Sequence, residues 1–262
     1  MSREAENPAD EMSFGEHLDA LRPHLLRSAG AVLLLAVAAL GAKSWLIDRL
    51  LFGPLRPDFP INRLLVRLGH FTPPDLTLVN TTVAGQFNLH LTVSFAAACA
   101  VGFPYLLWEL WRFVRPALTE RERRGCRHFI GYVSLGFFSG LAFGYLLLAP
   151  LSVTFLTTYR ASEAITNLID VHSYLAAVLN VSIACAVVFQ LPLLVWFLTR
   201  MGLLSPRLLR RYRRHAVVVL ALLAAIITPP DVFSMMLLLI PLYGLYELSI
   251  GISARACRQK QG

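Results

Sequence analysis

Few side chains in this 262-residue sequence have the type and spacing that chemistry in a protein site requires. The seven histidines are scattered, and no H-E-x-x-H, C-x-x-C, Walker or G-x-G-x-x-G pattern occurs. Scattered histidines lack the spacing of metal ligands. No nucleophile with a neighbouring base stands out for an intramembrane protease. We therefore expect neither an enzyme nor a bound metal or cofactor.

The polar residues that do stand out lie within or beside long apolar runs. Gln190 lies deep in one such run, in V-V-F-Q-L-P, and Glu109 and Glu247 lie near the ends of two others. Polar groups in such segments are rare and commonly functional. For Gln190, contact with a partner helix and internal hydrogen bonding beside Pro192 are both open. For Glu109 we expect pairing with a nearby arginine at the membrane surface, and Glu247 could pair in the same way.

Glu122 has two interpretations. It follows Thr119 by three residues, so the two complete a T-x-x-E capping box at the start of a helix. A carboxylate on a cytoplasmic surface could also receive a basic ligand. Glu120 is the only other acid between Arg112 and Arg127. A cationic ligand that reaches this strongly basic loop would therefore meet one of these two carboxylates.

The elements that must hold these side chains are membrane helices. The chain is 56% hydrophobic and 15% charged, whereas about a quarter of the residues in ordinary soluble domains are charged. The apolar residues form runs near the ~20 residues that cross a bilayer. Backbone polar groups in lipid must be satisfied within their own segment, so we expect helices. The six runs are 25–45, 87–108, 129–154, 174–197, 216–228 and 232–246.

The sequence therefore predicts an all-α polytopic membrane protein with six kinked transmembrane helices. A single membrane domain, 13–253, would lie between a disordered tail, 1–12, and a short cytoplasmic tail, 254–262. The prolines inside runs predict kinks, because each removes a backbone hydrogen bond. The last two runs are short: 13 residues in run 216–228 reach only ~20 Å, against a hydrocarbon core of ~30 Å. Glycines at four-residue intervals predict a close helix-packing face at Gly136, Gly140 and Gly144.

The distribution of basic residues predicts the orientation. With a cytoplasmic N-terminus, 18 of the 24 basic residues fall on the cytoplasmic side, as the positive-inside rule requires. Both ends would then be cytoplasmic. This asymmetry accounts for the net charge of +8, so the charge is no evidence for nucleic-acid binding. The proline-rich segment 46–81 would form a loop or a structured cap on the far side.

Three stretches carry a family resemblance. The first, F-G-E-H-L-D-A-L-R at 14–22, is similar to an N-terminal H-L-x-E-L-R motif, and an interfacial helix with a Ser13–Glu16 capping box is expected there. The second, 104–124, is similar to P…W-x-F…P-x-L…E-R-R. The third is T-P-P-D-V-F-S at 228–234, followed by I-P-L and Y-E. In this order, with six expected spans, they resemble the TatC family, the multispanning core subunit of the twin-arginine protein translocase.

The resemblance implies a function. TatC proteins bind the twin-arginine signal peptides of folded cargo proteins and recruit the single-span subunits TatA and TatB into an oligomeric complex. That complex uses the proton-motive force to move folded proteins across the bacterial cytoplasmic (inner) membrane. The absence of nucleotide motifs from this sequence agrees with such a mechanism.

The resemblance also implies roles for individual residues. Glu122 would face the arginine pair of the signal peptide, with Phe113 beside it. Ala20 stands where the family has an acid, so Asp19 is the best substitute, and Glu16 is a further candidate.

Gln190 stands where many family members have a glutamate. Its amide can still hydrogen-bond a partner helix but cannot titrate. Other positions that match polar or shape-determining positions of the family are Pro54, Tyr145, Asp231 and Glu247.

Two other functions are considered. A small-solute secondary transporter would show inverted repeats and broken helices around a site at mid-membrane, and no convincing repeat is present. An assembly scaffold without transport activity stays open.

Overall fold

The computed structural model describes residues 14–67, 77–114, 129–159, 162, 167–228 and 232–261, and most of these are helical. The longer helices are α1 (Phe14–Gly41), α3 (Gly85–Val114), α5 (Phe129–Phe143), α7 (Val171–Val188), α10 (Arg213–Ile227) and α11 (Val232–Gln261). The shorter ones are η1 (Trp45–Leu51), η2 (Gly53–Leu55), α2 (Pro60–Arg67), η4 (Gly144–Leu148), α6 (Ala149–Thr158), α8 (Leu191–Arg200) and α9 (Pro206–Arg211). The two strands are β1 (Leu78–Val79) and β2 (Ile169–Asp170).

Within the described ranges, five helical stretches are long and apolar enough to cross a membrane, so the chain is a multi-pass helical membrane protein. They are Leu21–Gly41, Gly85–Phe113, Ile130–Thr158, Val171–Arg200 and Ser234–Cys257. Helix α10, which covers the predicted run 216–228, has 15 residues and falls short of the ~20 that a span needs. The sixth span therefore stays a prediction.

The prediction that the last span is short was wrong. Helix α11 continues 15 residues past Tyr246 without a break, through the expected domain end at residue 253. Two polar residues in this part of α11 have partners in the protein: Ser253 and Thr199 of α8 share a hydrogen bond of 2.9 Å, and Ser249 donates to the Leu245 carbonyl at 2.6 Å. Both serines are fully buried. A polar stretch can stay helical when its hydroxyl groups have such partners.

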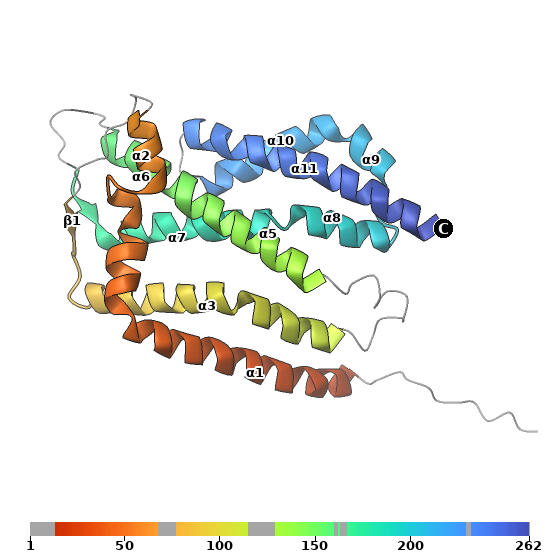
Figure 1. The fold of residues 1–262 in the computed structure, drawn as a ribbon, viewed down its shortest axis with the longest axis horizontal. Coiled ribbons are helices and arrows are strands. Elements are labelled where there is room, and N and C mark those ends of the chain that lie inside the picture. Colours follow the sequence, from red (N-terminus) through yellow and green to blue (C-terminus); the bar gives the residue numbers. More distant parts are fainter. Residues whose placement is uncertain are drawn as a thin grey trace, which may run out of the picture.

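The helices form an elongated bundle (Figure 1). Helices α1 and α3 pack along one edge, α5 packs on α7, and α11 packs on both α8 and α10. The start of α1 and the end of α11 lie at the same end of the bundle, whereas α2, β1 and α6 lie at the other end. The interfacial helix expected before the first span is continuous with it in α1.

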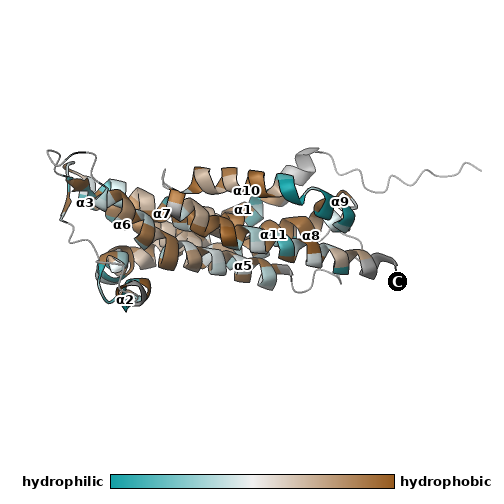
Figure 2. Ribbon diagram, turned by 90° about the horizontal axis from the view of Figure 1, so that it is seen from above, coloured by the Kyte–Doolittle hydropathy of each residue, from teal (hydrophilic) through white to brown (hydrophobic). Residues whose placement is uncertain are grey.

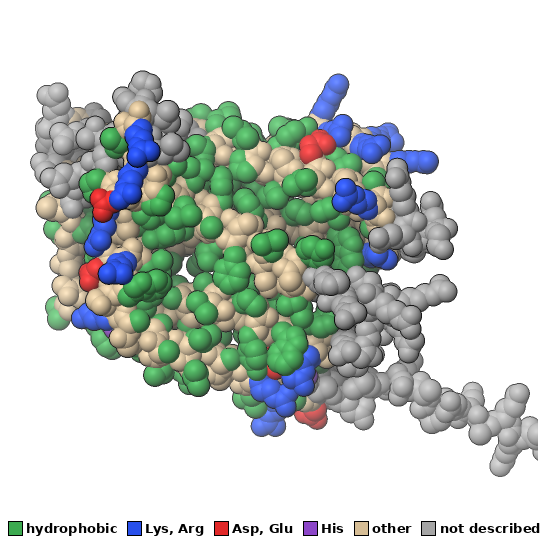
Figure 3. Space-filling model, viewed as in Figure 1, with side chains coloured by type: hydrophobic (Ala, Val, Ile, Leu, Met, Phe, Trp, Pro, Cys, Tyr) green, Lys and Arg blue, Asp and Glu red, His purple; other side chains and the backbone are tan. Residues whose placement is uncertain are grey.

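The hydropathy of the residues changes along the long axis of the bundle. Figure 2 shows hydrophobic residues along the middle of the helices and hydrophilic residues at α9 and around α2. On the face seen in Figure 3, hydrophobic side chains cover the middle, and most Lys and Arg side chains gather toward the ends. This pattern is that of a bundle whose middle faces lipid.

The predicted glycine face is the contact between the third and fourth spans. A Cβ atom on Gly140 would lie 2.6 Å from the carbonyl oxygen of Cys185, and one on Gly144 would lie 2.8 Å from Cα of Ser182. At Gly136, the Gln190 amide would lie 3.4 Å away. At Gly140 and Gly144 the α5–η4 helix therefore approaches α7 too closely for a side chain, whereas at Gly136 a Cβ atom would make an ordinary contact.

A proline kink is also confirmed. Helix α7 ends at Val188, and α8 begins at Leu191, with Pro192 at its first turn. Because Pro192 has no N–H to donate, the helix is interrupted at Phe189 and Gln190. Pro104 and Pro241, in contrast, lie inside continuous helices, α3 and α11.

The described part of segment 46–81, from η1 to β1, forms a structured cap at one end of the bundle. Tyrosines of the bundle hold this cap: Tyr145 donates a hydrogen bond to the carbonyl of Leu50, and Tyr174 donates one to that of Leu51 at 2.7 Å. Buried Asn62 donates to the Pro54 carbonyl at 2.9 Å. Pro54 is itself buried in η2.

A parallel strand pair, which the sequence analysis did not predict, closes the cap. Leu78 pairs with Ile169, and Val79 pairs with Asp170. Asp170 also accepts hydrogen bonds from the Thr81 hydroxyl at 2.8 Å and from the backbone N–H of His172 at 2.9 Å, which caps α7. The Thr81 bond is the main reason why the pKa of Asp170 lies below its usual value.

We expect Gly140→Ala to destabilise the protein and Gly131→Ala, on the same helix, to leave it stable. Nothing lies within 4 Å of a Cβ atom at Gly131, whereas one at Gly140 would press on the α7 backbone and on Phe189. Overpacking of this kind costs about 1–3 kcal/mol. Thermal unfolding of the two variants in detergent measures the difference. Equal midpoints would contradict the close α5–α7 contact.

Candidate functional site

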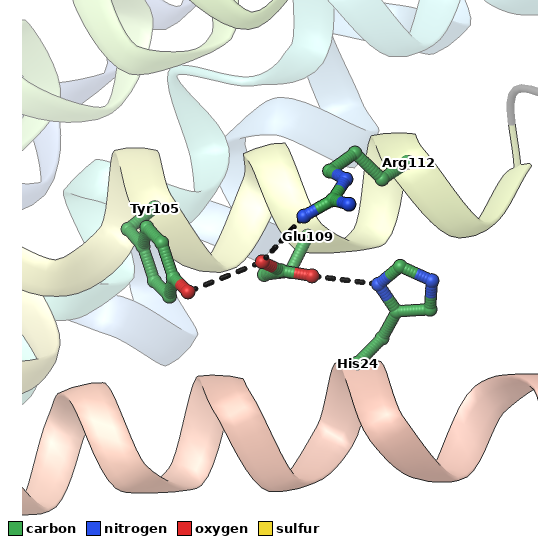
Figure 4. Close-up of polar contacts among 4 residues, drawn as sticks. All are labelled: His24, Tyr105, Glu109 and Arg112. Atoms are coloured by element: carbon green, nitrogen blue, oxygen red, sulfur yellow. Dashed lines mark hydrogen bonds and ion pairs between the residues drawn. The ribbon is translucent and has the colours of Figure 1, made fainter.

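The richest cluster of polar contacts in the described part of the bundle joins α1 to α3. Glu109 of α3 is only 1% exposed. Its Oε2 lies 2.6 Å from Nδ1 of His24 on α1, and its Oε1 accepts a hydrogen bond of 3.1 Å from the Tyr105 hydroxyl (Figure 4). The Arg112 guanidinium lies 3.3 Å from Oε1. One carboxylate thus contacts three groups that can donate a hydrogen bond.

Helical spacing positions the α3 members of this cluster. Tyr105, Glu109 and Arg112 follow one another at intervals of four and three residues, so they lie on one face. The Arg112 guanidinium also lies 5.0 Å from the centre of the Trp108 ring, a cation–π contact that helps orient it. The expected pairing of Glu109 with an arginine is therefore confirmed.

The contact from α1 requires a specific imidazole proton. An ionised carboxylate only accepts hydrogen bonds, so Nδ1 of His24 must carry the proton that Oε2 of Glu109 receives. This tautomer is assigned from the hydrogen-bond geometry. The pair is a polar link between the two helices, and none of the described residues 21–41 of α1 is buried within the protein. The cluster therefore fixes where α1 sits on α3.

Phe113, a predicted recognition residue, adjoins this cluster. Its ring meets the His24 ring edge to face, with 6.2 Å between centroids and an interplanar angle of 62°. Asp19 is exposed on α1, five residues before His24. Glu16 belongs to α1, but its side chain is outside the described residues, as is all of Glu122. Among the predicted recognition residues whose side chains are described, the structure thus brings Phe113 into the cluster, through His24.

Gln190 lies at the break between α7 and α8. Its Nε2 donates to the carbonyls of Val133, on α5, and Ala186, on α7, both at 3.3 Å. The internal hydrogen bonding considered for this residue is therefore present. Both bonds use the amide nitrogen, so the carbonyl oxygen keeps its capacity to accept a further bond.

The remaining predicted residues are dispersed. Pro54 and Tyr145 belong to the cap contacts at the opposite end of the bundle. Glu247 of α11 accepts hydrogen bonds from Arg213 at 2.8 Å and from Tyr243 at 3.1 Å. Asp231 lies outside the described residues, as does Ser13 of the expected capping box. Within the described ranges, no three His, Cys, Asp or Glu side chains gather as a metal site requires.

His24 is the residue that sequence reasoning missed. It was counted among the scattered histidines, and no spacing rule relates it to Glu109, 85 positions later. The sequence held an indirect signal. A carboxylate within a span needs a partner. His24 lies near the start of the first span and Glu109 near the end of the second, so the two residues should lie at a similar depth in the membrane.

We expect Glu109→Gln to destabilise the protein more than Glu247→Gln. Glutamine keeps the shape of the side chain but loses the charge that attracts Arg112 and the imidazole of His24. The Glu109 side chain is 1% exposed and that of Glu247 is 34% exposed, so water can replace the lost contacts only at Glu247. Thermal unfolding midpoints in detergent test this order, and the reverse order would contradict it.

Comparisons with known proteins agree with this architecture. The family model described as Sec-independent protein translocase protein (TatC) matches residues 16–241. The Sec-independent protein translocase protein TatC of Blattabacterium sp. subsp. Periplaneta americana is 35% identical over 264 residues, covering 97% of this chain and 99% of the relative. The TatC protein of Deinococcus radiodurans is 34% identical over 239 residues, covering 91% and 84%.

Solved structures agree as well. A crystal structure of the twin arginine translocase receptor TatC matches with a TM-score of 0.68 at 27% identity, covering 92% of this chain and all of that one. A second, of the same receptor in DDM, gives a TM-score of 0.70 at 27% identity and covers 91% and 99%. On these matches of sequence and fold, the chain belongs to the TatC family of Sec-independent protein translocase proteins.

Proposed function

We propose that this chain is the receptor for twin-arginine signal peptides in a Sec-independent translocase that moves folded proteins. The observation that carries the proposal is the match to the two solved receptor structures over more than nine tenths of the chain. The chain would act with single-span TatA and TatB subunits in an oligomeric complex, driven by the proton-motive force. Family membership agrees with the expectation that it is no enzyme. No comparison supports the small-solute transporter.

The proposed location is the bacterial inner membrane, with both termini in the cytoplasm. The beginning of α1 and the end of α11 lie at one end of the bundle, and the predicted topology assigns 18 of the 24 basic residues to the cytoplasmic side. The cap would then face outward. A cysteine placed at Asp58 should react with an impermeant label added outside the cell, and one at Arg210 should not. Labelling of position 58 from the cytoplasm alone would refute this orientation.

Signal recognition is assigned to the cytoplasmic end of α1 and α3. Arginine binds a carboxylate through two parallel hydrogen bonds, which lysine cannot reproduce. The loop after α3 is strongly basic, so an arginine pair needs a local acid to be attracted there. We assign that role to Glu122, with Phe113 as its apolar neighbour. Asp19 and Glu16, on the first turns of α1, would supply further negative charge.

The cluster around Glu109 supports this assignment in one respect. Phe113 packs against His24, and His24 contacts Glu109, so the end of α3 is held in a defined position against α1. The loop that carries Glu122 begins directly after this fixed end. A recognition surface on rigid elements binds with less loss of conformational entropy than one on a free loop.

We expect Glu122→Gln to weaken binding of a twin-arginine peptide at least about tenfold, because a charge-assisted pair contributes about 1.5–3 kcal/mol. Glutamine also serves at this position of a capping box, so the helix start is retained. Fluorescence anisotropy with a labelled signal peptide measures the affinity, and Glu120→Gln is the matched control. Parent-like affinity of Glu122→Gln would leave Glu122 as a helix cap only.

Gln190 is assigned to partner docking. It is a strongly polar side chain at the break in the fourth span, and its amide oxygen can accept a hydrogen bond from a neighbouring transmembrane helix. Pro54, Tyr145, Asp231 and Glu247 complete the set of residues that we propose for function.

We expect Gln190→Leu to reduce co-purification of the single-span subunits while signal-peptide affinity stays unchanged. An interhelical hydrogen bond in a membrane contributes roughly 0.5–2 kcal/mol, so recovery should fall without being abolished. Quantitative pull-down from membranes measures it. Unaltered assembly and transport in this variant would mean that Gln190 serves only its bonds to Val133 and Ala186.

A further inference from the structure

A groove of about 660 Å³ opens between α5, α8 and α11. Its wall is mostly apolar, and the polar side chains that matter here are Gln190, Trp196, Arg200 and Arg255. Gln190 directly precedes α8, and Arg200 ends that helix ten residues later, which corresponds to about 15 Å along its axis. The groove is therefore long enough to run from mid-membrane depth to the membrane surface.

The two arginines lie at one end of this groove. Arg200 is the last residue of α8, and Arg255 lies in the last two turns of α11. Both helices end at the same end of the bundle (Figure 1). The Arg200 guanidinium lies 5.6 Å from the centre of the Trp196 ring, one turn deeper. Tryptophan and arginine together are typical of the level of lipid headgroups.

The groove carries a net positive charge. Its described lining contains two arginines and no acid. Glu247, the acid on α11 nearest to it in sequence, is not part of the lining and pairs with Arg213. Two guanidinium groups at a membrane surface, above an apolar trough, match a phosphodiester attached to an acyl chain. Basic pockets between transmembrane helices recognise such headgroups, and arginine can bind a phosphate through two hydrogen bonds.

We propose that this groove is a binding site for an anionic phospholipid. The phosphate lies between Arg200 and Arg255, and an acyl chain follows the apolar wall toward Gln190. The site is separate from signal recognition, which involves α1 and the loop after α3. It is also testable apart from partner docking, because a partner helix at Gln190 would meet the acyl chain and leave the two arginines untouched.

Native mass spectrometry of the purified full-length protein in detergent tests the proposal. Dioleoylphosphatidylglycerol and dioleoylphosphatidylcholine are added separately, because they share acyl chains and differ in headgroup charge. We expect the protein to retain the anionic lipid preferentially. The double variant Arg200→Gln/Arg255→Gln should lower the ratio of retained anionic to zwitterionic lipid roughly tenfold or more, since each arginine near a membrane surface contributes about a few-fold in affinity.

Two further variants test whether the preference depends on the charges of the groove. Arg207→Gln/Arg210→Gln removes two exposed charges of α9 at the same end of the bundle and should keep the preference. Arg200→Lys/Arg255→Lys keeps both charges and should retain most of the preference.

Two results would overturn the proposal. If the parent protein retains both lipids equally, the groove holds apolar chains or a partner helix without reading a headgroup. If the α9 double variant loses the preference as fully as the groove variant does, the attraction is a diffuse effect of surface charge. Inorganic phosphate added at millimolar concentration should not displace the lipid, because the acyl chain supplies part of its affinity.

Discussion

Hydrocarbon offers no hydrogen bonds, so a polar group that this chain buries among its spans depends on the protein itself for a partner. Glu109 shows how this is done, with contacts to an imidazole, a phenol and a guanidinium. Ser253 and Thr199 satisfy one another between α11 and α8. These pairs join helices at defined heights. In a medium where lipid tails are as apolar as leucine, such pairs, together with close packing, determine which helices meet.

Close packing supplies the other half of the architecture. The glycines of α5 and η4 let that helix lie directly on the α7 backbone, and dispersion between the two backbones replaces contacts with lipid. Where Pro192 interrupts the next helix, the Gln190 amide covers the opened carbonyl groups and reaches across to Val133. At the other end of the bundle, Tyr145 and Tyr174 fasten the cap through backbone carbonyls. Close packing of glycine-lined helices thus stabilises the middle of the bundle, and hydrogen bonds join its elements at both ends.

We assign two binding sites to the same end of the bundle, and they differ in the charge of their side chains. A surface rich in arginine repels an arginine pair unless a carboxylate reverses the local sign, and the recognition that we propose for a twin-arginine signal therefore relies on acids beside α1 and α3. The groove between α8 and α11 has no acid in its described lining and therefore suits a phosphate. The distribution of a few acids over a basic surface would decide which ligand binds where.

Length and composition alone determined that the chain crosses a membrane, because ~20 apolar residues have no other stable environment. Local spacing also determined the glycine face, the break at Pro192 and the pairing of Glu109 with an arginine, since partners three or four residues apart share a helix face. Only tertiary structure could bring His24 to Glu109, or β1 to β2, because nothing in a single sequence reports contacts between distant segments. It also decided the length of α11, whose polar residues stay helical because α8 provides a hydroxyl partner for Ser253.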